Sequence, residues 1–243
     1  FIWDDFCSWY LEIAKEKFYS DTDPVVHLTT KWVLLDVFQQ SMRLIHPIMP
    51  FISEEIWQLI KQYYPMDEEA LIIAQFPLTD ENKINHEIMN NMALIMESIS
   101  AIRNLRKQVN LAPGLEIELT IKCVDDSQVK LYENYQNYLK KLAKVKTAHV
   151  GIDVEKPKSS LAAVAQNVQI FLPLAGLIDV EAEKQRLSKQ IAKLEQELSV
   201  IQRKLGNEQF VSNAKEEVVA KEKEKEAEVS DKLSKTKDIY NGL

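Results

Sequence analysis

The stretch LPLAGLIDVEAEKQRLSKQIAKLEQELSVIQRKLGNEQF, residues 172–210, decides the fold of this chain. From Val180 onward, its core positions recur at alternating steps of four and three residues, the repeat of a helix packed lengthwise on another helix. These positions are Val180, Lys184, Leu187, Ile191, Leu194, Leu198, Ile201 and Leu205. Gly206-Asn207 follows, and a glycine in the left-handed conformation commonly ends a helix. The pattern predicts one long helix that ends near Leu205.

A second helical segment, rich in Lys and Glu and nearly as long, follows to about Tyr240. Two helices of matched length around a short turn predict an antiparallel coiled-coil hairpin within one chain, and we expect a monomer. A second interpretation stays open, in which this coiled coil is a structural module that pairs with another protein. The Gly206-Asn207 turn favours the hairpin, and sedimentation would reveal a dimer formed through the helices.

The composition is that of an ordinary soluble protein, with 46% hydrophobic and 28% charged residues among 243. Only five glycines are present, which argues against a Gly-rich phosphate loop. Cys7 and Cys123 are isolated, so neither a disulfide framework nor a zinc site is expected. No apolar run approaches the ~20 residues of a membrane span, and no signal peptide precedes the first helix. A cytoplasmic protein without membrane contact is the expectation.

The net charge of −7 hides an uneven distribution. Residues 1–100 carry six Lys or Arg against sixteen Asp or Glu, whereas residues 101–150 carry nine against five, a net charge of +4. A phosphate backbone responds to local charge, because salt screens interactions beyond about 8–10 Å. The basic middle of the chain is therefore compatible with a nucleic-acid partner.

Changes in the spacing of the apolar residues divide the chain into three parts. Two of the three are helical, so we predict a mainly α fold. Residues 1–112 form a helical bundle, 113–175 a small α/β module with strands, and 176–243 the hairpin arm. The chain opens on Phe-Ile-Trp, already in a helical pattern, so we expect residue 1 to lie inside a domain. The module is interpreted as a spacer that orients the arm.

Three local features of the bundle carry further expectations. Ser53 is predicted to be a helix N-cap, and residues 71–76 to be a short extended piece. The four tryptophans stand at core spacings, so core packing is favoured over base stacking for each of them: Trp3, Trp9, Trp32 and Trp57. His46, before Pro47, is interpreted as a histidine satisfied within its turn.

Two runs in the bundle resemble a known family. They are RLIHPIMPFISEEIW, residues 43–57, and WDDFCSWYLEIAK, residues 3–15. Both are similar to the anticodon-binding bundle of class I aminoacyl-tRNA synthetases for branched aliphatic amino acids. The arm narrows the choice, because LPLAGLID at 172–179 and KLGN at 204–207 resemble the C-terminal coiled coil of bacterial valyl-tRNA synthetases. An isoleucine enzyme of this type would end in a Cys-rich zinc module instead.

The resemblance implies the C-terminal fragment of an enzyme that joins valine to tRNA(Val) using ATP and Mg²⁺. The family's nucleotide-binding signatures, of the His-Ile-Gly-His and Lys-Met-Ser-Lys-Ser types, do not occur in this sequence. The catalytic and editing domains are therefore expected outside this stretch, which would perform no chemistry and hold no cofactor. The implied partner is tRNA rather than DNA.

Two groups of residues are candidates for RNA contact. Arg103, Arg106, Lys107 and Asn110 recur at helical spacing beside the Ile102–Leu105–Val109 stripe, near the Pro113-Gly114 turn. They fit anticodon-stem phosphates or loop bases, although cations in a last helical turn also complement the helix dipole. The resemblance implies that the arm lies along the corner of the tRNA. Its candidate cations are Lys184, Arg186, Lys189, Lys193, Arg203 and Lys204, with acids interleaved among them.

Overall fold

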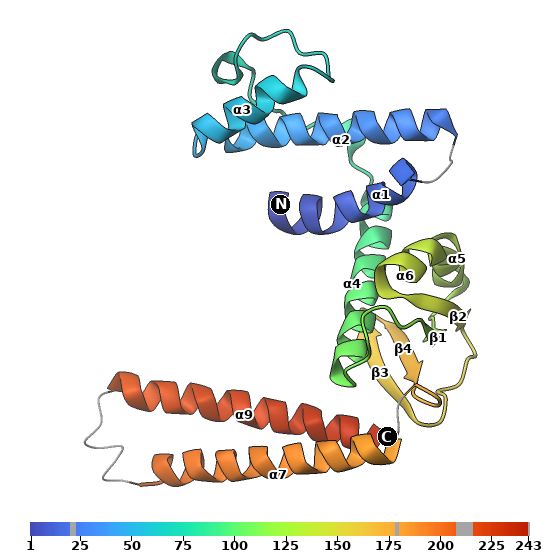
Figure 1. The fold of residues 1–243 in the computed structure, drawn as a ribbon, viewed down its shortest axis with the longest axis vertical. Helices are drawn as coiled ribbons and strands as arrows, with labels where there is room; N and C mark the ends of the chain where they lie inside the picture. The colour runs from blue at the N-terminus through green and yellow to red at the C-terminus, as the bar shows by residue number, and fades with distance from the viewer. Residues whose placement is uncertain (20–22, 178–179, 208–215, 243) are drawn as a thin grey trace. The chain divides into compact units, whose positions relative to one another are not determined.

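The structure is a computed structural model that describes residues 1–19, 23–177, 180–207 and 216–242 (Figure 1). It divides into two compact units, Phe1–Met89 and Asn90–Leu243. The predicted architecture is confirmed: helices come first, then a small mixed sheet with its own helices, then a two-helix hairpin.

The first unit is helical throughout its regular structure. Its elements are η1 (Ile2–Tyr10), α1 (Leu11–Tyr19), α2 (Pro24–Ile45), α3 (Pro50–Ile60), η2 (Leu71–Ile73) and η3 (Glu81–Lys83). The core of this unit lies between α2, α3 and η2, where Met42, Trp57, Ile60 and Leu71 are buried together. We predicted a short extended piece at residues 71–76, but residues 71–73 form the 3₁₀ helix η2, so that prediction is wrong. The described part of this unit contains no strand.

The junction between α2 and α3 corrects the predicted cap. Helix α3 begins at Pro50, whose fixed φ suits the first helical position, and Ser53 lies buried one turn inside the helix. The Ser53 hydroxyl donates to the carbonyl of Met49 over 2.7 Å and lies 2.8 Å from His46 Nδ1. Ser53 is therefore a buried link between the helices, and His46 finds its side-chain partner in α3, not within its own turn as we predicted.

The tryptophans of the first unit differ in exposure. Trp57 is fully buried, with the Arg43 guanidinium 5.1 Å from its ring centroid. Trp3 is 79% exposed on η1. Core packing is thus confirmed for Trp57 and wrong for Trp3.

The second unit contains a four-stranded sheet whose order is β2-β1-β4-β3. Its elements are the main part of α4 (His86–Gln108), β1 (Ile117–Lys122), α5 (Asp126–Asn134), α6 (Gln136–Ala143), β2 (Val145–Gly151), β3 (Ser160–Ala165) and β4 (Val168–Pro173). Strands β1 and β2 are parallel, which requires a crossover, and α5 and α6 supply it. The other two strand pairs are antiparallel.

Helix α4 belongs to the core of this sheet module. Its apolar stripe is buried, and alternate residues of β1 are buried as well. The Ser98 hydroxyl of α4 lies 2.6 Å from the Tyr132 hydroxyl of α5, and both side chains are fully buried. The packing thereby fixes the position of the α4 C-terminus against α6, where the candidate RNA-binding residues lie.

The arm is a hairpin of α7 (Val180–Leu205) and α9 (Glu216–Gly242), which lie side by side (Figure 1). Leu187, Ile201, Val229 and Leu233 are buried in this hairpin. The heptad pattern predicted the burial of Leu187 and Ile201. Gly206 does not adopt the left-handed conformation that we expected, since Gly176 is the one described glycine with positive φ. Its amide instead donates to the Gln202 carbonyl over 2.8 Å and continues the helical pattern. Most of the connection that follows, residues 208–215, lies outside the described residues.

Within the described ranges, no helix is long and apolar enough to cross a membrane. The same residues contain no group of three or more His, Cys, Asp or Glu side chains arranged to hold a metal ion.

Candidate nucleic-acid interface

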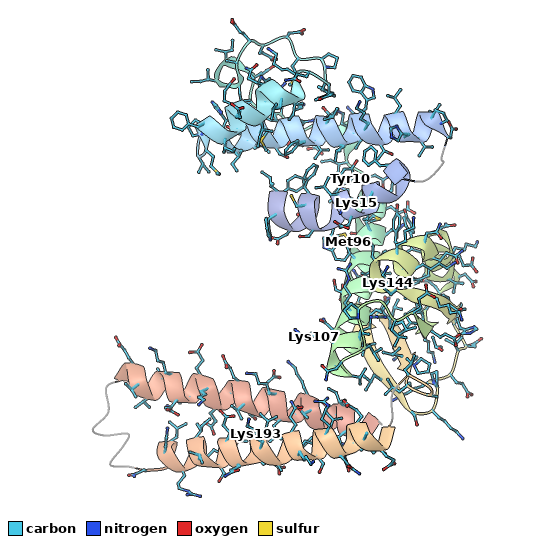
Figure 2. The ribbon with its side chains drawn as sticks, viewed as in Figure 1. Tyr10, Lys15, Met96, Lys107, Lys144 and Lys193 are labelled. Carbon is cyan, nitrogen blue, oxygen red and sulfur yellow. The ribbon has the colours of Figure 1, made fainter. Side chains whose placement is uncertain are left out.

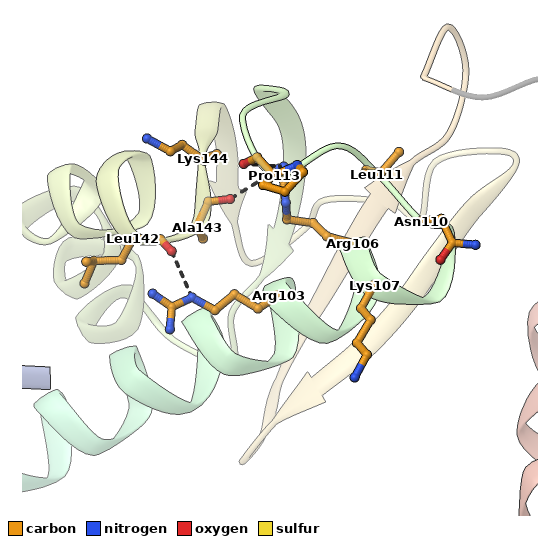
Figure 3. A pocket seen from close by; sticks show the side chains of 9 residues that line it. All are labelled: Arg103, Arg106, Lys107, Asn110, Leu111, Pro113, Leu142, Ala143 and Lys144. Atoms are coloured by element: carbon orange, nitrogen blue, oxygen red, sulfur yellow. Dashed lines mark hydrogen bonds between the residues drawn. The ribbon is translucent and has the colours of Figure 1, made fainter. Parts of the chain in front are cut away.

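The end of α4 and the end of α6 enclose a hollow of about 490 Å³. We call it the cationic pocket (Figure 3). Its lining residues are Arg103, Arg106, Lys107, Asn110, Leu111, Pro113, Leu142, Ala143 and Lys144. All four residues that the sequence predicted on α4 are among them, so the structure brings that group together.

Arg106 is the structural member of this group. It is only 7% exposed, and its guanidinium donates to the carbonyls of Ala112 (2.8 Å), Pro113 (3.3 Å) and Ala143 (3.5 Å). Burial lowers the pKa of this guanidinium below its ordinary value. From the sequence we placed Arg106 beside the apolar stripe of α4. In the structure Arg106 belongs to the buried face of the helix, because that face is wider than the stripe. Arg106 therefore fastens the turn after α4 to the end of α6.

Arg103 links the same two elements from a more exposed position. Its Nε donates to the Leu142 carbonyl over 2.9 Å, at the C-terminal end of α6 (Figure 3). The last carbonyls of a helix carry partial negative charge and attract cations, which explains why both arginines reach toward residues 142–143. Arg103 is thus held at the rim of the pocket.

Lys107 and Asn110 face solvent and have no side-chain hydrogen bond or ion pair with any other residue in the described ranges. Asn110 has a φ of 49°, the left-handed conformation that asparagine tolerates at a helix end. The side chains of both residues remain available to a ligand.

Lys144 is the pocket residue that the sequence interpretation missed. It caps α6 with φ 56° and ψ 45°, a left-handed conformation that usually selects glycine. The signal in the sequence was the basic run Lys140, Lys141 and Lys144 just before a predicted strand, in a module interpreted as a spacer. Figure 2 shows Lys107 and Lys144 on neighbouring elements of the second unit.

The charge of the pocket has one sign. Four cations line it, and no aspartate or glutamate is among the described residues that do so. Positive charge gathered in a hollow attracts anions, and arginine and lysine are the usual phosphate contacts of RNA-binding proteins. The geometry suits a phosphate group or a single extruded nucleotide.

The six candidate cations of the arm differ in their local contacts. The Arg186 guanidinium donates twice to Glu183, which raises the pKa of Arg186, and Lys204 lies 3.3 Å from Glu222 of α9. Lys184 occupies a half-buried core position. Lys189, Lys193 and Arg203 are exposed and form no ion pair with another described residue.

Two family descriptions match this chain. Residues 1–121 match the anticodon-binding domain of tRNA ligases, and residues 179–243 match the tRNA binding arm of valyl-tRNA synthetases. The cationic pocket draws its α4 residues from the first match and its α6 residues from the segment between the two.

Individual relatives agree with these matches. The chain is 40% identical to a valine–tRNA ligase of Listeria monocytogenes, over 96% of its own length and 26% of that protein. It is 37% identical to one of Bacillus subtilis, over 93% and 25% of the two lengths. A Fusobacterium nucleatum valine–tRNA ligase is 35% identical, over 98% and 27%. The chain spans about a quarter of the length of the curated relatives it matches.

Proposed function

Because the chain belongs to the valine–tRNA ligase family and carries its anticodon-binding domain and tRNA binding arm, we propose that it recognises tRNA(Val) for an enzyme that ligates valine to that tRNA. The catalytic part of such an enzyme would consume ATP with Mg²⁺. We assign no ATP or Mg²⁺ site to the residues that this structure describes. The partner is tRNA rather than DNA or a membrane, and the protein acts as a cytoplasmic monomer.

The observation that supports this proposal is the cationic pocket. It combines four basic side chains with an amide, Asn110, and its walls are fixed by hydrogen bonds from Arg103 and Arg106. A preorganised pocket of this kind favours an RNA phosphate because the cations need not be gathered when the ligand binds. In the proposed complex Lys107, Asn110 and Lys144 contact the anticodon stem-loop, and Arg106 holds the pocket in shape.

The direct test is a gel-shift titration of this chain with tRNA(Val) at about 50 and 200 mM salt. A protein that neutralises several phosphates loses affinity steeply over that range, because bound counterions are released from the RNA. A tRNA with a different anticodon and a DNA hairpin of equal charge are the controls. Absent binding at the lower salt, or affinity that does not respond to salt, would contradict the proposal.

A second measurement addresses the oligomeric state. Sedimentation of the free chain should give a monomer, because α7 already has α9 of the same chain as its partner. A stable dimer that dissociates when the arm is removed would favour the alternative in which the coiled coil joins two proteins.

A further inference from the structure

The heptad register of the hairpin sorts its charged residues by face. In each heptad of a coiled coil, two positions face the partner helix, two flank that contact, and three point outward. The buried residues Leu187 and Ile201 on α7, and Val229 and Leu233 on α9, fix the register. Each charged residue at 181–205 and 217–241 can therefore be assigned to a face.

The outward positions of α7 carry positive charge only. We call this set the outer face of α7, and Lys193 in Figure 2 belongs to it. Its ten exposed members are Ala182, Gln185, Arg186, Lys189, Ala192, Lys193, Gln196, Ser199, Val200 and Arg203. Four of them are basic and none is acidic. The cations extend from Arg186 to Arg203, about 26 Å along the helix at 1.5 Å per residue.

The outward positions of α9 have the opposite balance. This outer face of α9 contains five acids and two lysines, and all its residues are exposed. The charged members are Glu217, Lys221, Glu224, Glu228, Asp231, Lys235 and Asp238. Lys235 is in addition paired with Asp231, at 2.6 Å.

Two of the acids that interleave with the cations of α7 in sequence are directed toward α9, whereas Glu183 pairs with Arg186 of the outer face. Glu195 and Glu197 occupy flanking positions, where they meet lysines of α9. Lys237 Nζ lies 2.7 Å from Glu195, and Lys225 Nζ lies 3.5 Å from Glu197. These two ion pairs join acids of α7 to lysines of α9, and Lys204 of α7 with Glu222 of α9 forms a third pair of the opposite sense. On the outer face of α7, Arg186 is paired with Glu183, whereas Lys189, Lys193 and Arg203 form no ion pair with another described residue.

We propose that the arm binds the phosphate backbone of tRNA through the outer face of α7, while the outer face of α9 turns toward solvent. This inference rests on the proposed function and specifies which surface of the arm performs it. Like charges repel, so the five acids of α9 oppose an approach of RNA from that side. The partner chemistry is a continuous polyanion rather than an unpaired base, because no aromatic side chain stands among the ten outward positions of α7.

The experiment compares two matched charge reversals in the complete chain. Lys189→Glu with Lys193→Glu changes the outer face of α7, and Lys221→Glu with Lys235→Glu changes that of α9 by the same net charge. We expect the α7 variant to bind tRNA(Val) about tenfold more weakly at 0.1 M salt, with a salt slope smaller by about 1.5. The α9 variant should bind within about twofold of the wild type. Lys189→Gln with Lys193→Gln, together with helix content from circular dichroism, controls for loss of folding.

The outcomes separate this inference from the proposed function. If the wild type fails to bind tRNA, the proposed function is wrong. If the wild type binds and the α7 and α9 variants lose affinity equally, or the α9 variant loses more, tRNA binding stands and the assignment to α7 is overturned. If the α7 charge-reversal variant loses both tRNA affinity and helix content, the glutamine variant decides. Weaker tRNA binding with normal helix content in the glutamine variant supports the assignment to α7, and unchanged binding overturns it.

Discussion

In the cationic pocket, basic groups from α4 and from the end of α6 converge on one hollow, and hydrogen bonds from Arg103 and Arg106 to backbone carbonyls hold its walls. On the outer face of α7, basic groups of a single helix line up because the heptad register turns Glu195 and Glu197 toward α9. The basic side chains of the pocket are brought together by tertiary packing, whereas those of the outer face of α7 are aligned by their spacing along the helix. Lysine and arginine side chains can therefore form a binding surface in two ways, by packing several elements around one hollow or by their spacing along one helix. Substitutions in the two surfaces should differ in their effects on stability and on tRNA affinity.

The largest expected difference concerns affinity for tRNA. Lys107→Glu with Lys144→Glu should weaken binding about 100-fold, on the order of 1.4 kcal/mol for each reversed charge. The corresponding reversal of Lys189 and Lys193 should weaken it about tenfold, because charges on an exposed helix are better screened. Equal losses, measured by the same titration, would remove the proposed distinction between the two surfaces.

The next difference concerns stability. Arg106→Met should lower the free energy of unfolding by about 2–3 kcal/mol, because carbonyls that now accept from a buried guanidinium lose their partner. Arg186→Met on the arm should cost less, about 0.5–1 kcal/mol, since Arg186 is exposed and its partner Glu183 keeps 12% of its side chain in contact with solvent. Urea unfolding of both variants checks this. A stable Arg106→Met protein would show that the pocket does not depend on the buried guanidinium.

A smaller effect tests how α4 is held against the module. Tyr132→Phe should cost about 1 kcal/mol by removing the buried hydrogen bond to Ser98. Burial raises the pKa of Tyr132 to about 12, above the ordinary 10, so the free energy of unfolding of the wild type should fall as the pH rises from 10 to 12, because the unfolded tyrosine ionises in that range and the buried one does not.

The phenylalanine variant should not show that part of the decline. Tyr63→Phe, at a residue 64% exposed, is the matched control. Identical pH profiles of stability for wild type and Tyr132→Phe would contradict the assignment.

The smallest effect separates function from stability at one residue. Lys144 occupies a left-handed conformation that glycine adopts without strain, so Lys144→Gly should stabilise the fold by about 0.5–1 kcal/mol. The same change should weaken tRNA binding because it removes a cation from the pocket. Thermal melts and the titration together measure both. Unchanged affinity would mean that Lys144 serves no RNA contact.

The two regions also differ in what the sequence could predict. The register of α7 was readable from the spacing of Leu187 to Leu205, and its outer face follows from that register. The register of α9 came from the burial of Val229 and Leu233 in the structure. Only part of the pocket could be predicted from the sequence. Helical spacing identified the cations of α4, but it did not identify Lys144. Its position depends on the crossover that brings α6 beside α4, which involves contacts between residues about 40 positions apart.

The errors in the bundle have a similar origin. Ser53 has the chemistry of an N-cap, but Pro50 begins the helix earlier, and the Ser53 hydroxyl donates to the Met49 carbonyl and lies beside His46 Nδ1 instead. Arg106 is charged, yet carbonyls from the turn after α4 and from the end of α6 allow its burial. In each case, contacts outside the residue's own helical turn override the local preference. The domain boundaries at 112 and 175 remain predictions.

A double-mutant cycle on tRNA(Val) affinity tests whether the cationic pocket and the outer face of α7 bind the same tRNA. It combines Lys107→Gln with Lys144→Gln in the pocket, and Lys189→Gln with Lys193→Gln on the outer face of α7. If one tRNA contacts both surfaces, each pair should lower the salt slope by about 1.5, and the combined variant should lose the product of the separate affinity losses. A combined variant that binds no more weakly than the worse single pair would contradict the account.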